Sequence, residues 1–251
     1  QPHPQSLTVG GVTCVMDLQS PARLGEYMVK FQEMADFINR AYWPDLVMAA
    51  KAYANEPSVV NDIGTPNLMT YQDFQIGANE YLFDGGYILN GDISKVFEVD
   101  ENLITEEATR SWYKNDAPLH PYDGDTTPNY TGFKDAKTLN AKGEMEESKV
   151  FDIAGKYSWI KAPRYNSLPM QVGPIANIVV NYVKGNKNVV PVVDKFLAET
   201  GLPVSAVLST LGRTACRMIE AKIIADNALK ALNNLIENLK VDDSTCAKYQ
   251  I

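Results

Sequence analysis

Apolar residues recur at helical spacing near the start of the chain. Between residues 21 and 42 they fall three or four positions apart: Leu24, Tyr27, Met28, Phe31, Met34, Ala35, Ile38 and Tyr42. This spacing predicts an amphipathic helix with a buried stripe, and it favours a core role over a cofactor site. Ser20 and Pro21 suit its N-cap and first helical position. Pro44 is expected to kink or end the helix, and a second helix follows over 45–54.

The last third of the chain shows the same period. From Val172 the pattern is helical, with a short helix over 189–199 that Gly201 closes. The longest helix is predicted over 203–240, with an apolar side formed by Val207, Leu211, Ala215, Met218, Ala225, Leu229, Leu232, Ile236 and Leu239. At ~1.5 Å per residue it would be on the order of 55 Å long. A compact domain of this size is only about 36 Å across, so we expect further protein beside the helix.

The region between these helices is rich in turn residues. "NDIGTPN", "FDGGYILNGDIS" and "NDAPLHPYDGDTTPNYTG" predict turns, with short strands near 81–83 and 87–89 and one short helix over 105–113. The stretch "GKYSWIKAPRYNSLPMQVGPIAN" (155–177) holds three prolines and is expected to be neither helix nor strand.

These patterns predict a mainly α fold with minor β structure, of the α+β class. We expect a single segment of a larger subunit with three parts. Residues 1–56 form an extended start plus helices, residues 57–170 are irregular and turn-rich with short β structure, and residues 171–251 are helical.

Composition narrows the function classes. Hydrophobic residues make up 45% and charged residues 22% of the chain, as in ordinary globular proteins. The net charge of −8 argues against a nucleic-acid partner, which needs a basic surface. Apolar runs such as 175–180 are much shorter than the roughly 20 residues that span a bilayer. The opening "QPHPQS" has neither signal-peptide features nor an initiator Met, so we expect a processed N-terminus or a piece of a longer chain.

Residues that could carry chemistry are few. Cys14, Cys216 and Cys246 form no CxxC pair, and buried or idle thiols are expected. His3 and His120 are too few for a metal site. His120 is expected to make a structural hydrogen bond, while His3, in Pro-His-Pro, could present its ring to a partner.

Other motifs are incomplete. "DGDTTPN" resembles the start of a calcium loop, but Thr127 and Lys134 stand at ligand positions and Pro128 replaces the Gly of the turn, so it is interpreted as a turn. No GxGxxG, P-loop or GxSxG motif is present. Lys161 and Arg164 flank Pro163. Two interpretations are open. Either both side chains lie on a solvated loop, or the prolines hold the two cations against a buried acidic or metal-bearing site.

Six stretches together resemble one family in the order that the family has them: "PHPQSLTVGGV" (2–12), "GGYILNGD" (85–92), "SWYK…LHPYDGDTTPNYTG" (111–132), "YSWIKAPRY" (157–165), "VGPIAN" (172–177) and "STLGRTACRMIEA" (209–221). The chain is similar to the middle of the large subunit of nickel–iron (NiFe) hydrogenases, most of all to the bacterial membrane-bound uptake type. An unrelated acidic helical binding protein would need all six matches to be accidental.

The resemblance implies an internal part of the helix-bundle large-subunit fold. The implied reaction is the reversible oxidation of H2 to protons and electrons at a Ni–Fe centre with diatomic ligands and a nearby Mg. The implied partners are H2, an iron–sulfur small subunit with its clusters, and a membrane cytochrome b. The implied location is peripheral, on the periplasmic side of the cytoplasmic membrane. Electron acceptor, oxygen tolerance and oligomeric state are left open.

The family binds its metals through an Arg-x-Cys-x-x-Cys and an Asp-Pro-Cys-x-x-Cys motif, and neither is in this sequence. We therefore assign no catalytic residue and no metal ligand here, and we expect the segment alone to be inactive. The alternative is a non-catalytic scaffold or interaction module derived from such a subunit. The flanking residues would discriminate between the two.

Three residues carry over from the family. His3 matches a histidine that faces the small subunit near its proximal iron–sulfur cluster. Lys161 and Gln171 fall in stretches that the resemblance places beside the metal and magnesium region, without contacting the metals. Position 171 is usually Glu in the family, so Gln171 makes a proton relay there doubtful. Asn177 likewise replaces a common Arg.

Overall fold

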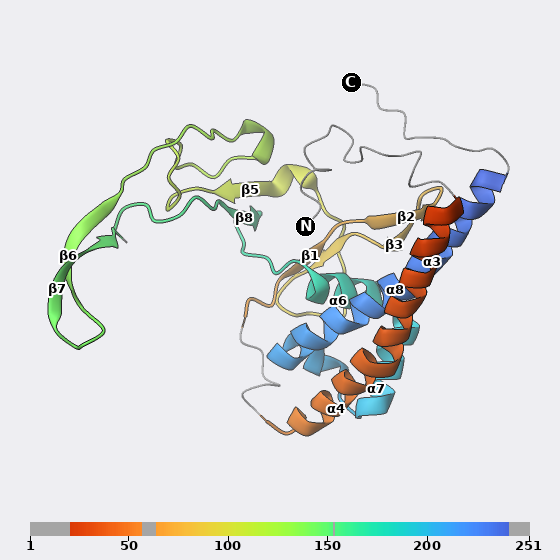
Figure 1. Cartoon of the computed structure of the whole chain (residues 1–251). Coiled ribbons are helices and arrows are strands. Elements are labelled where there is room, and N and C mark those ends of the chain that lie inside the picture. Colours follow the sequence, from red (N-terminus) through yellow and green to blue (C-terminus); the bar gives the residue numbers. More distant parts are fainter. Residues whose placement is uncertain (1–20, 57–63, 153, 241–251) are drawn as a thin grey trace. The chain divides into compact units, whose positions relative to one another are not determined.

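The computed structural model describes residues 21–56, 64–152 and 154–240. The chain divides into two compact units. Unit 1 comprises Gln1–Gly64, Thr70–Gly85 and Gly173–Ile251, and unit 2 comprises Thr65–Met69 and Gly86–Val172. The structure is 44% helical and 21% strand, which confirms the predicted mainly α class with minor β structure. Figure 1 shows the helices of unit 1 and the paired strands of unit 2.

The first predicted helix is present and is interrupted as expected. Helix α3 (Pro21–Phe37) begins at Pro21 and continues through a π-helical turn (Ile38–Tyr42) into α4 (Trp43–Tyr53). In the π turn, the backbone N–H of Trp43 donates to the carbonyl of Ile38, one residue further back than in an α-helix. Pro44 has no N–H to donate, so the ladder changes geometry just before it.

The other helices of unit 1 are α6 (Pro174–Lys184), α7 (Val190–Thr200) and α8 (Thr210–Lys240). Gly185 and Gly201 close α6 and α7 in the left-handed conformation, and the closure by Gly201 was predicted.

Helix α8 begins at Thr210, so the predicted helix over 203–240 is wrong at its start. A 3-10 helix (Val204–Leu208) fills that stretch. A new helix starts because the Ser209 hydroxyl accepts a hydrogen bond from the backbone N–H of Gly212, at 3.0 Å, and so caps the first turn.

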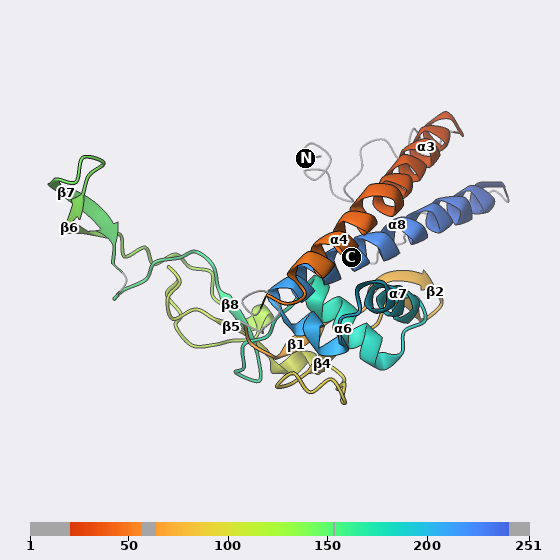
Figure 2. The ribbon, with the colours of Figure 1, turned by 90° about the horizontal axis from the view of Figure 1, so that it is seen from below.

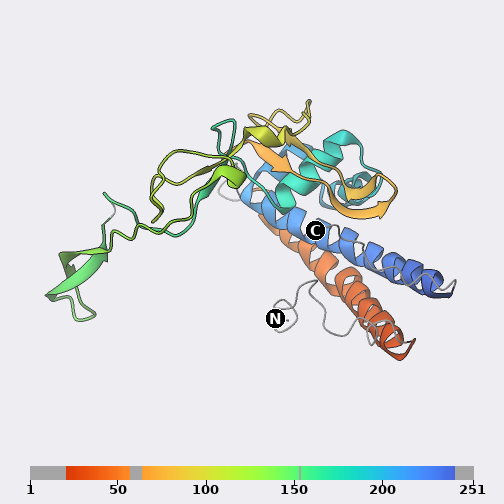
Figure 3. The same ribbon diagram turned by 90° about the horizontal axis from the view of Figure 1, so that it is seen from above.

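The core of unit 1 is built around α8. This helix packs against α3, α4 and α6, and Figures 2 and 3 show α3 and α8 side by side over most of their length. Ala35 and Ile38 bury their side chains against Ala225. One polar contact also joins these helices: the amino group of Lys222 donates to Asn39, in the π turn, at 2.5 Å. Across the described residues, no helix combines the length and apolar character needed to cross a membrane.

Unit 1 also contains a small hairpin. Strand β2 (Asp73–Gly77) pairs antiparallel with β3 (Glu80–Phe83), where the sequence predicted a strand. Asn181 of α6 anchors the end of the hairpin, since its side-chain oxygen accepts from the backbone N–H of Asp84 at 2.7 Å and its NH2 group donates to the Asp84 carbonyl at 3.0 Å. The buried amide thus replaces a missing strand partner.

Unit 2 consists of paired strands joined by turns. Strand β1 (Leu68–Thr70), of which Leu68 and Met69 belong to this unit, pairs with β4 (Gly86–Ile88), which confirms the second predicted strand. Strand β5 (Ile104–Glu107) pairs antiparallel with β8 (Ala162–Tyr165).

The strand β5 corrects two predictions. The helix expected over 105–113 is absent, and residues 162–165 are a strand rather than irregular chain. "TEEATR" has good helix formers, but pairing with a strand more than fifty residues away in sequence decides the conformation instead.

A hairpin that the sequence reading missed completes unit 2. Strand β6 (Phe133–Leu139) pairs antiparallel with β7 (Met145–Phe151) over seven residue pairs. Asn140 shapes the turn, because its side-chain oxygen accepts from the N–H groups of Lys142 and Glu144.

Candidate functional site

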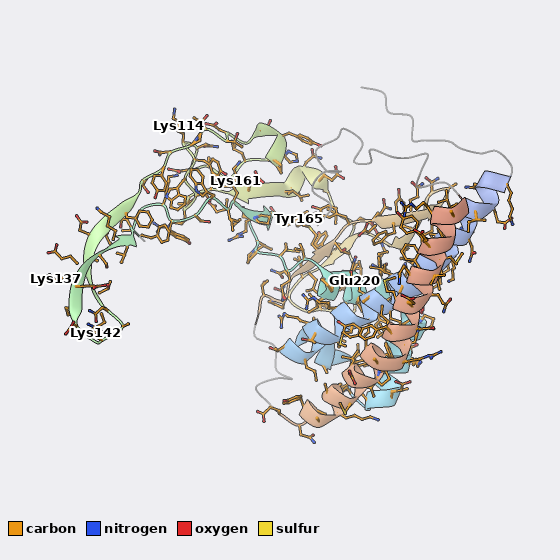
Figure 4. All side chains as sticks on the ribbon, viewed as in Figure 1. Lys114, Lys137, Lys142, Lys161, Tyr165 and Glu220 are labelled. Atoms are coloured by element: carbon orange, nitrogen blue, oxygen red, sulfur yellow. The ribbon has the colours of Figure 1, made fainter. Side chains whose placement is uncertain are left out.

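Lys161 is a sequence-predicted site residue whose side chain is largely enclosed. Its side chain is only 12% exposed, and its amino group lies 3.2 Å from a carboxylate oxygen of Glu106. The same amino group lies 5.1 Å from the centre of the Tyr113 ring. The pairing of β5 with β8 brings Glu106 and Lys161 together, because Lys161 directly precedes β8 (Figure 4).

A second buried lysine lies close by, and sequence reasoning missed it. Lys156 is 8% exposed and forms an ion pair with Asp116. Its amino group also donates to the backbone carbonyl of Tyr113 at 2.8 Å. Both lysines therefore contact Tyr113, one at its carbonyl and one at its ring. The sequence offers only a weak signal for this, a lysine among aromatic residues in "GKYSWIK".

Aromatic rings hold this loop in place. The Trp112 indole N–H donates to the carbonyl of Lys156 at 2.8 Å. The Trp112 ring lies 5.0 Å from Trp159 and 4.9 Å from Tyr130, both edge to face. Edge-to-face contacts of the half-exposed Trp159 and Tyr130 rings with the buried Trp112 ring stabilise one arrangement of the loop. The two lysines are thus presented by a fixed backbone.

Arg164 has different surroundings from Lys161. Its guanidinium donates to the carbonyl of Pro163 at 2.9 Å. It also contributes to the lowered pKa of Glu107, although the hydrogen bonds from Thr109 are the larger cause. Of the two cations that flank Pro163, only Lys161 is pinned against a partly buried carboxylate.

Gln171 holds two segments of unit 2 together. Its backbone N–H donates to Asn67 at 2.7 Å and its carbonyl accepts from Met69 at 2.9 Å. Its side-chain NH2 group donates to the carbonyl of Thr65. An ionised carboxylate at this position would face that carbonyl without a proton to share, whereas the amide of Gln171 donates one.

Asn177 belongs to unit 1 and joins a buried polar chain. The Thr70 hydroxyl donates to its side-chain oxygen at 2.5 Å, and its NH2 group donates to Glu220 of α8 at 2.7 Å. Figure 4 labels Glu220 on this helix. The sequence reading noted Asn177 only as a departure from a common Arg and missed the carboxylate that it contacts.

His120 and the turn from Asp123 behave as predicted. The His120 ring nitrogen accepts from the backbone N–H of Tyr122 at 3.2 Å, a structural hydrogen bond. The carboxylate of Asp125 accepts from the N–H and hydroxyl of Thr127, which closes a turn and lowers the pKa of Asp125. His3, Cys14 and Cys246 lie outside the described residues.

The described residues do not fit a nickel–iron centre. Within them, no group of three or more His, Cys, Asp or Glu side chains is placed to hold a metal. Cys216 is fully buried, and burial, with a further contribution from Glu220, raises the pKa of its thiol to about 12. Such a thiol stays protonated at neutral pH, whereas metal ligation needs a thiolate.

Comparison with known proteins decides the family. The family model described as "Nickel-dependent hydrogenase" matches residues 1–251. The chain belongs to the nickel-dependent hydrogenase family. It is 52% identical, over all of its length, to the quinone-reactive Ni/Fe-hydrogenase large chain of Wolinella succinogenes. It is 35% identical, over 98% of its length, to the uptake hydrogenase large subunit of Rhizobium leguminosarum bv. viciae.

Solved hydrogenase structures share its fold. The NiFeSe hydrogenase of Dm. baculatum matches 92% of this chain with a TM-score of 0.66 and 23% identity, and 42% of that chain is covered. The Ni-Fe-Se hydrogenase of D. vulgaris Hildenborough in the reduced state matches 92% of this chain with a TM-score of 0.60 and 22% identity, and 43% of that chain is covered.

The chain spans less than half the length of the hydrogenase subunits that it matches. It covers 44% of the Wolinella succinogenes large chain and 43% of the Rhizobium leguminosarum subunit. The resemblance read from six motifs is thereby confirmed at the level of the family and of the large subunit.

Proposed function

We propose that this chain is the middle part of the large, catalytic subunit of a nickel–iron hydrogenase that reversibly oxidises H2 to protons and electrons. The observation that carries the proposal is the 52% identity to a Ni/Fe-hydrogenase large chain over the whole of this chain. Among the described residues, the chain supplies no group of side chains suited to a metal. The cysteines that hold the Ni–Fe centre with its diatomic ligands, and the residues that hold the Mg, would therefore come from flanking sequence.

The partners follow from the same proposal. Electrons leave through the iron–sulfur clusters of a small subunit, in a heterodimer. A membrane cytochrome b accepts them next, in keeping with the words "quinone-reactive" in the name of the Wolinella succinogenes protein. The heterodimer is peripheral, on the periplasmic side of the cytoplasmic membrane.

We assign His3 to the contact with the small subunit. An imidazole N–H donor near the proximal cluster would stabilise electron density on the cluster sulfurs and so raise its potential. Redox-titrated paramagnetic resonance of a His3→Ala enzyme should show a lowered midpoint potential. An unchanged potential removes this assignment.

Lys161 and Gln171 have positioning roles in this proposal. The loop from Gly155 braces the part of the large subunit that carries the active site, and the Lys161–Glu106 pair fixes that loop. Gln171 ties the loop's end to residues 65–69. Neither side chain is assigned a step in the reaction.

The Lys161→Ala variant tests the proposal in the complete enzyme. Loss of the amino group leaves Glu106 without its cation in a partly buried position, so the loop loses its anchor. We expect slower H2-dependent dye reduction or a lower nickel content in the purified enzyme. Lys142→Ala, in the exposed turn of the β6–β7 hairpin, is the control and should leave both unchanged. Wild-type turnover and nickel content in Lys161→Ala would contradict the proposed role.

The competing function is a non-catalytic scaffold. Sequencing the residues that flank this segment in the native polypeptide distinguishes the enzyme from the scaffold. If both cysteine motifs are present, the protein is an enzyme, and if both are missing, it is a scaffold.

A further inference from the structure

A loop of unit 2 lies against the ion pair between Lys161 and Glu106. It spans residues 119–127, includes a 3-10 helix (Pro121–Asp123), and is called the covering loop below. A Cβ at Gly124 would lie 3.1 Å from the amino nitrogen of Lys161 and 3.5 Å from Oε2 of Glu106. The shorter distance is tighter than an ordinary van der Waals contact of 3.4–4 Å. The lysine therefore occupies space that a side chain at position 124 would need.

The backbone at position 124 does not itself require glycine. Its φ of −71° and ψ of 129° lie in the extended region that every L-residue adopts, including β-branched ones. Gly132, by contrast, has a φ of 77°, where glycine is favoured by its conformational freedom. What distinguishes Gly124 is the space that its missing side chain leaves.

Hydrogen bonds hold both ends of the covering loop. At one end, the backbone N–H of Glu106 donates to the carbonyl of Leu119 at 2.8 Å. At the other end, the N–H of Lys114 donates to the carbonyl of Thr127 at 3.0 Å. Figure 4 labels Lys114 and Lys161 in this part of the chain. Because the loop is tied at both ends, a side chain at position 124 would displace the flexible lysine rather than the loop.

These contacts lie within one unit and are already enclosed. The side chain of Lys161 is 12% exposed and that of Glu106 is 32% exposed. Both residues and the covering loop belong to unit 2. Further protein beside this unit can only lower the exposed fractions, so the packing does not depend on how much of the subunit is present.

We propose that Gly124 is a positioning residue of the hydrogenase: the absence of a side chain there lets Lys161 reach Glu106 beneath the covering loop. Alanine at this position would push the lysine amino group aside by a few tenths of an ångström, and valine would push it further. Gly124 acts through Lys161, so its effect on turnover rests on the proposed function of the braced loop.

Amine acylation of the complete enzyme, with its partner subunits, reports on Lys161 without reference to activity. The probe is sulfosuccinimidyl acetate, and peptide mass spectrometry measures the rate at Lys161. An amino group displaced from its carboxylate is open to the reagent more of the time, so Gly124→Val should acylate at Lys161 at least about threefold faster than the wild type. Gly124→Ala should lie between the two.

Gly155→Ala is the matched control for Gly124→Ala. Gly155 also lies in a loop of unit 2, and its Cβ would have no neighbour nearer than 3.4 Å, an ordinary contact. Lys161 in this variant should react at the wild-type rate. Equal rates at Lys161 in the wild type and in Gly124→Val overturn the proposal.

A double-mutant cycle distinguishes the contact with Lys161 from a general defect of the loop. With Lys161 present, Gly124→Val should lower the thermal unfolding midpoint of the enzyme. In the Lys161→Ala background the amino group is gone, and valine should leave the midpoint unchanged or raise it, because it restricts the unfolded chain. An equal loss in both backgrounds overturns the proposal.

The cycle also decides the case in which Gly124→Val does not assemble. Adding Lys161→Ala should then restore an assembled enzyme, because it removes the group that the valine meets. Failure to recover any assembled enzyme overturns the proposal, since the defect would then have a cause other than Lys161.

H2-dependent dye reduction tests the proposed function separately. If the loop is a brace, Gly124→Val should slow turnover or lower the nickel content, and Gly124→Val with Lys161→Ala should be no worse than Lys161→Ala alone. Faster acylation of Lys161 together with wild-type turnover and nickel content would uphold the positioning of Lys161 by Gly124 and contradict the role of the loop in the enzyme.

Discussion

At the scale of single residues, the buried lysines of unit 2 show how a charge is used structurally. A lysine taken out of water needs a carboxylate or several acceptors near its amino group. Lys161 has Glu106 and the face of Tyr113, and Lys156 has Asp116 and the carbonyl of Tyr113. These contacts tie "KYSWIK" (156–161) to the chain some forty to fifty-five residues earlier.

The sequence indicated Lys161 but not its partner. Lysine among prolines and aromatics suggests a held cation, whereas Glu106 is one of many acidic residues in the chain and nothing local marks it. A partner fifty-five positions away is chosen by strand pairing, which a single sequence reveals poorly. Lys156 and the contact between Asn177 and Glu220 were missed because their partners, too, are distant in sequence, 40 and 43 positions away.

Cys216 gives a prediction that needs no knowledge of the active site. A rise in its pKa from 9.0 to about 12 lowers the thiolate fraction at neutral pH roughly 1000-fold. In a variant with Cys14→Ser and Cys246→Ser, Cys216 is the remaining cysteine. Iodoacetamide should label it roughly 1000-fold more slowly, or slower still, in the native protein than in the protein unfolded by urea. Equal rates before and after unfolding would show that the thiol is exposed and the packing of α8 is wrong.

The same thiol links stability to pH with a defined sign. Because its pKa is higher in the folded state, the unfolded chain loses this proton first as the pH rises. The thiol's contribution to the free energy of unfolding is present below about pH 9 and declines between about 9 and 12. Comparison with Cys216→Ala over this range isolates the effect, since the variant should show a shallower decline.

At the scale of elements, helices were easier to predict than strands. The spacing of Leu24, Phe31 and Ile38 and the glycine at 201 are local signals, and both were sufficient. The strands β6 and β7 mix charged residues with small or apolar ones without a regular alternation, and both faces of the hairpin are largely open to water. Without a buried side, "FKDAKTL" and "MEESKVF" lack the apolar alternation that marks a strand.

Gly212 makes the start of α8 testable. A Cβ at this position would lie 2.1 Å from the backbone carbonyl oxygen of Val207, closer than atoms can approach. Gly212→Ala should therefore lower the free energy of unfolding by about 2–4 kcal/mol, although Ala is normally the better helix former. Chemical denaturation of the purified protein measures this.

Gly25, in α3, is the matched control. Nothing lies within 4 Å of the position that its Cβ would take. Gly25→Ala should stabilise the protein by about 0.5–1 kcal/mol. A Gly212→Ala protein that gains stability as Gly25→Ala does would refute the close approach between the 3-10 helix and α8.

At the scale of the whole molecule, the family membership agrees with the long last helix and with the share of its relative that the chain covers. The helices around α8 and the braced loop of unit 2 provide a framework, and the described residues hold no cluster suited to a metal. The predicted length of the last helix had already suggested more protein beside it, and α8 keeps 31 residues of that length. The coverage of 44% of the Wolinella succinogenes large chain agrees with this expectation.

The intact mass and terminal peptides of the native polypeptide, taken from its own source, test the central proposal most directly. The account predicts a chain a little over twice the 27.8 kDa of this sequence, with an Arg-x-Cys-x-x-Cys motif before it and an Asp-Pro-Cys-x-x-Cys motif after it. A native mass of 27.8 kDa would contradict it, because a chain without either motif cannot hold the nickel–iron centre, and the scaffold function would then take its place.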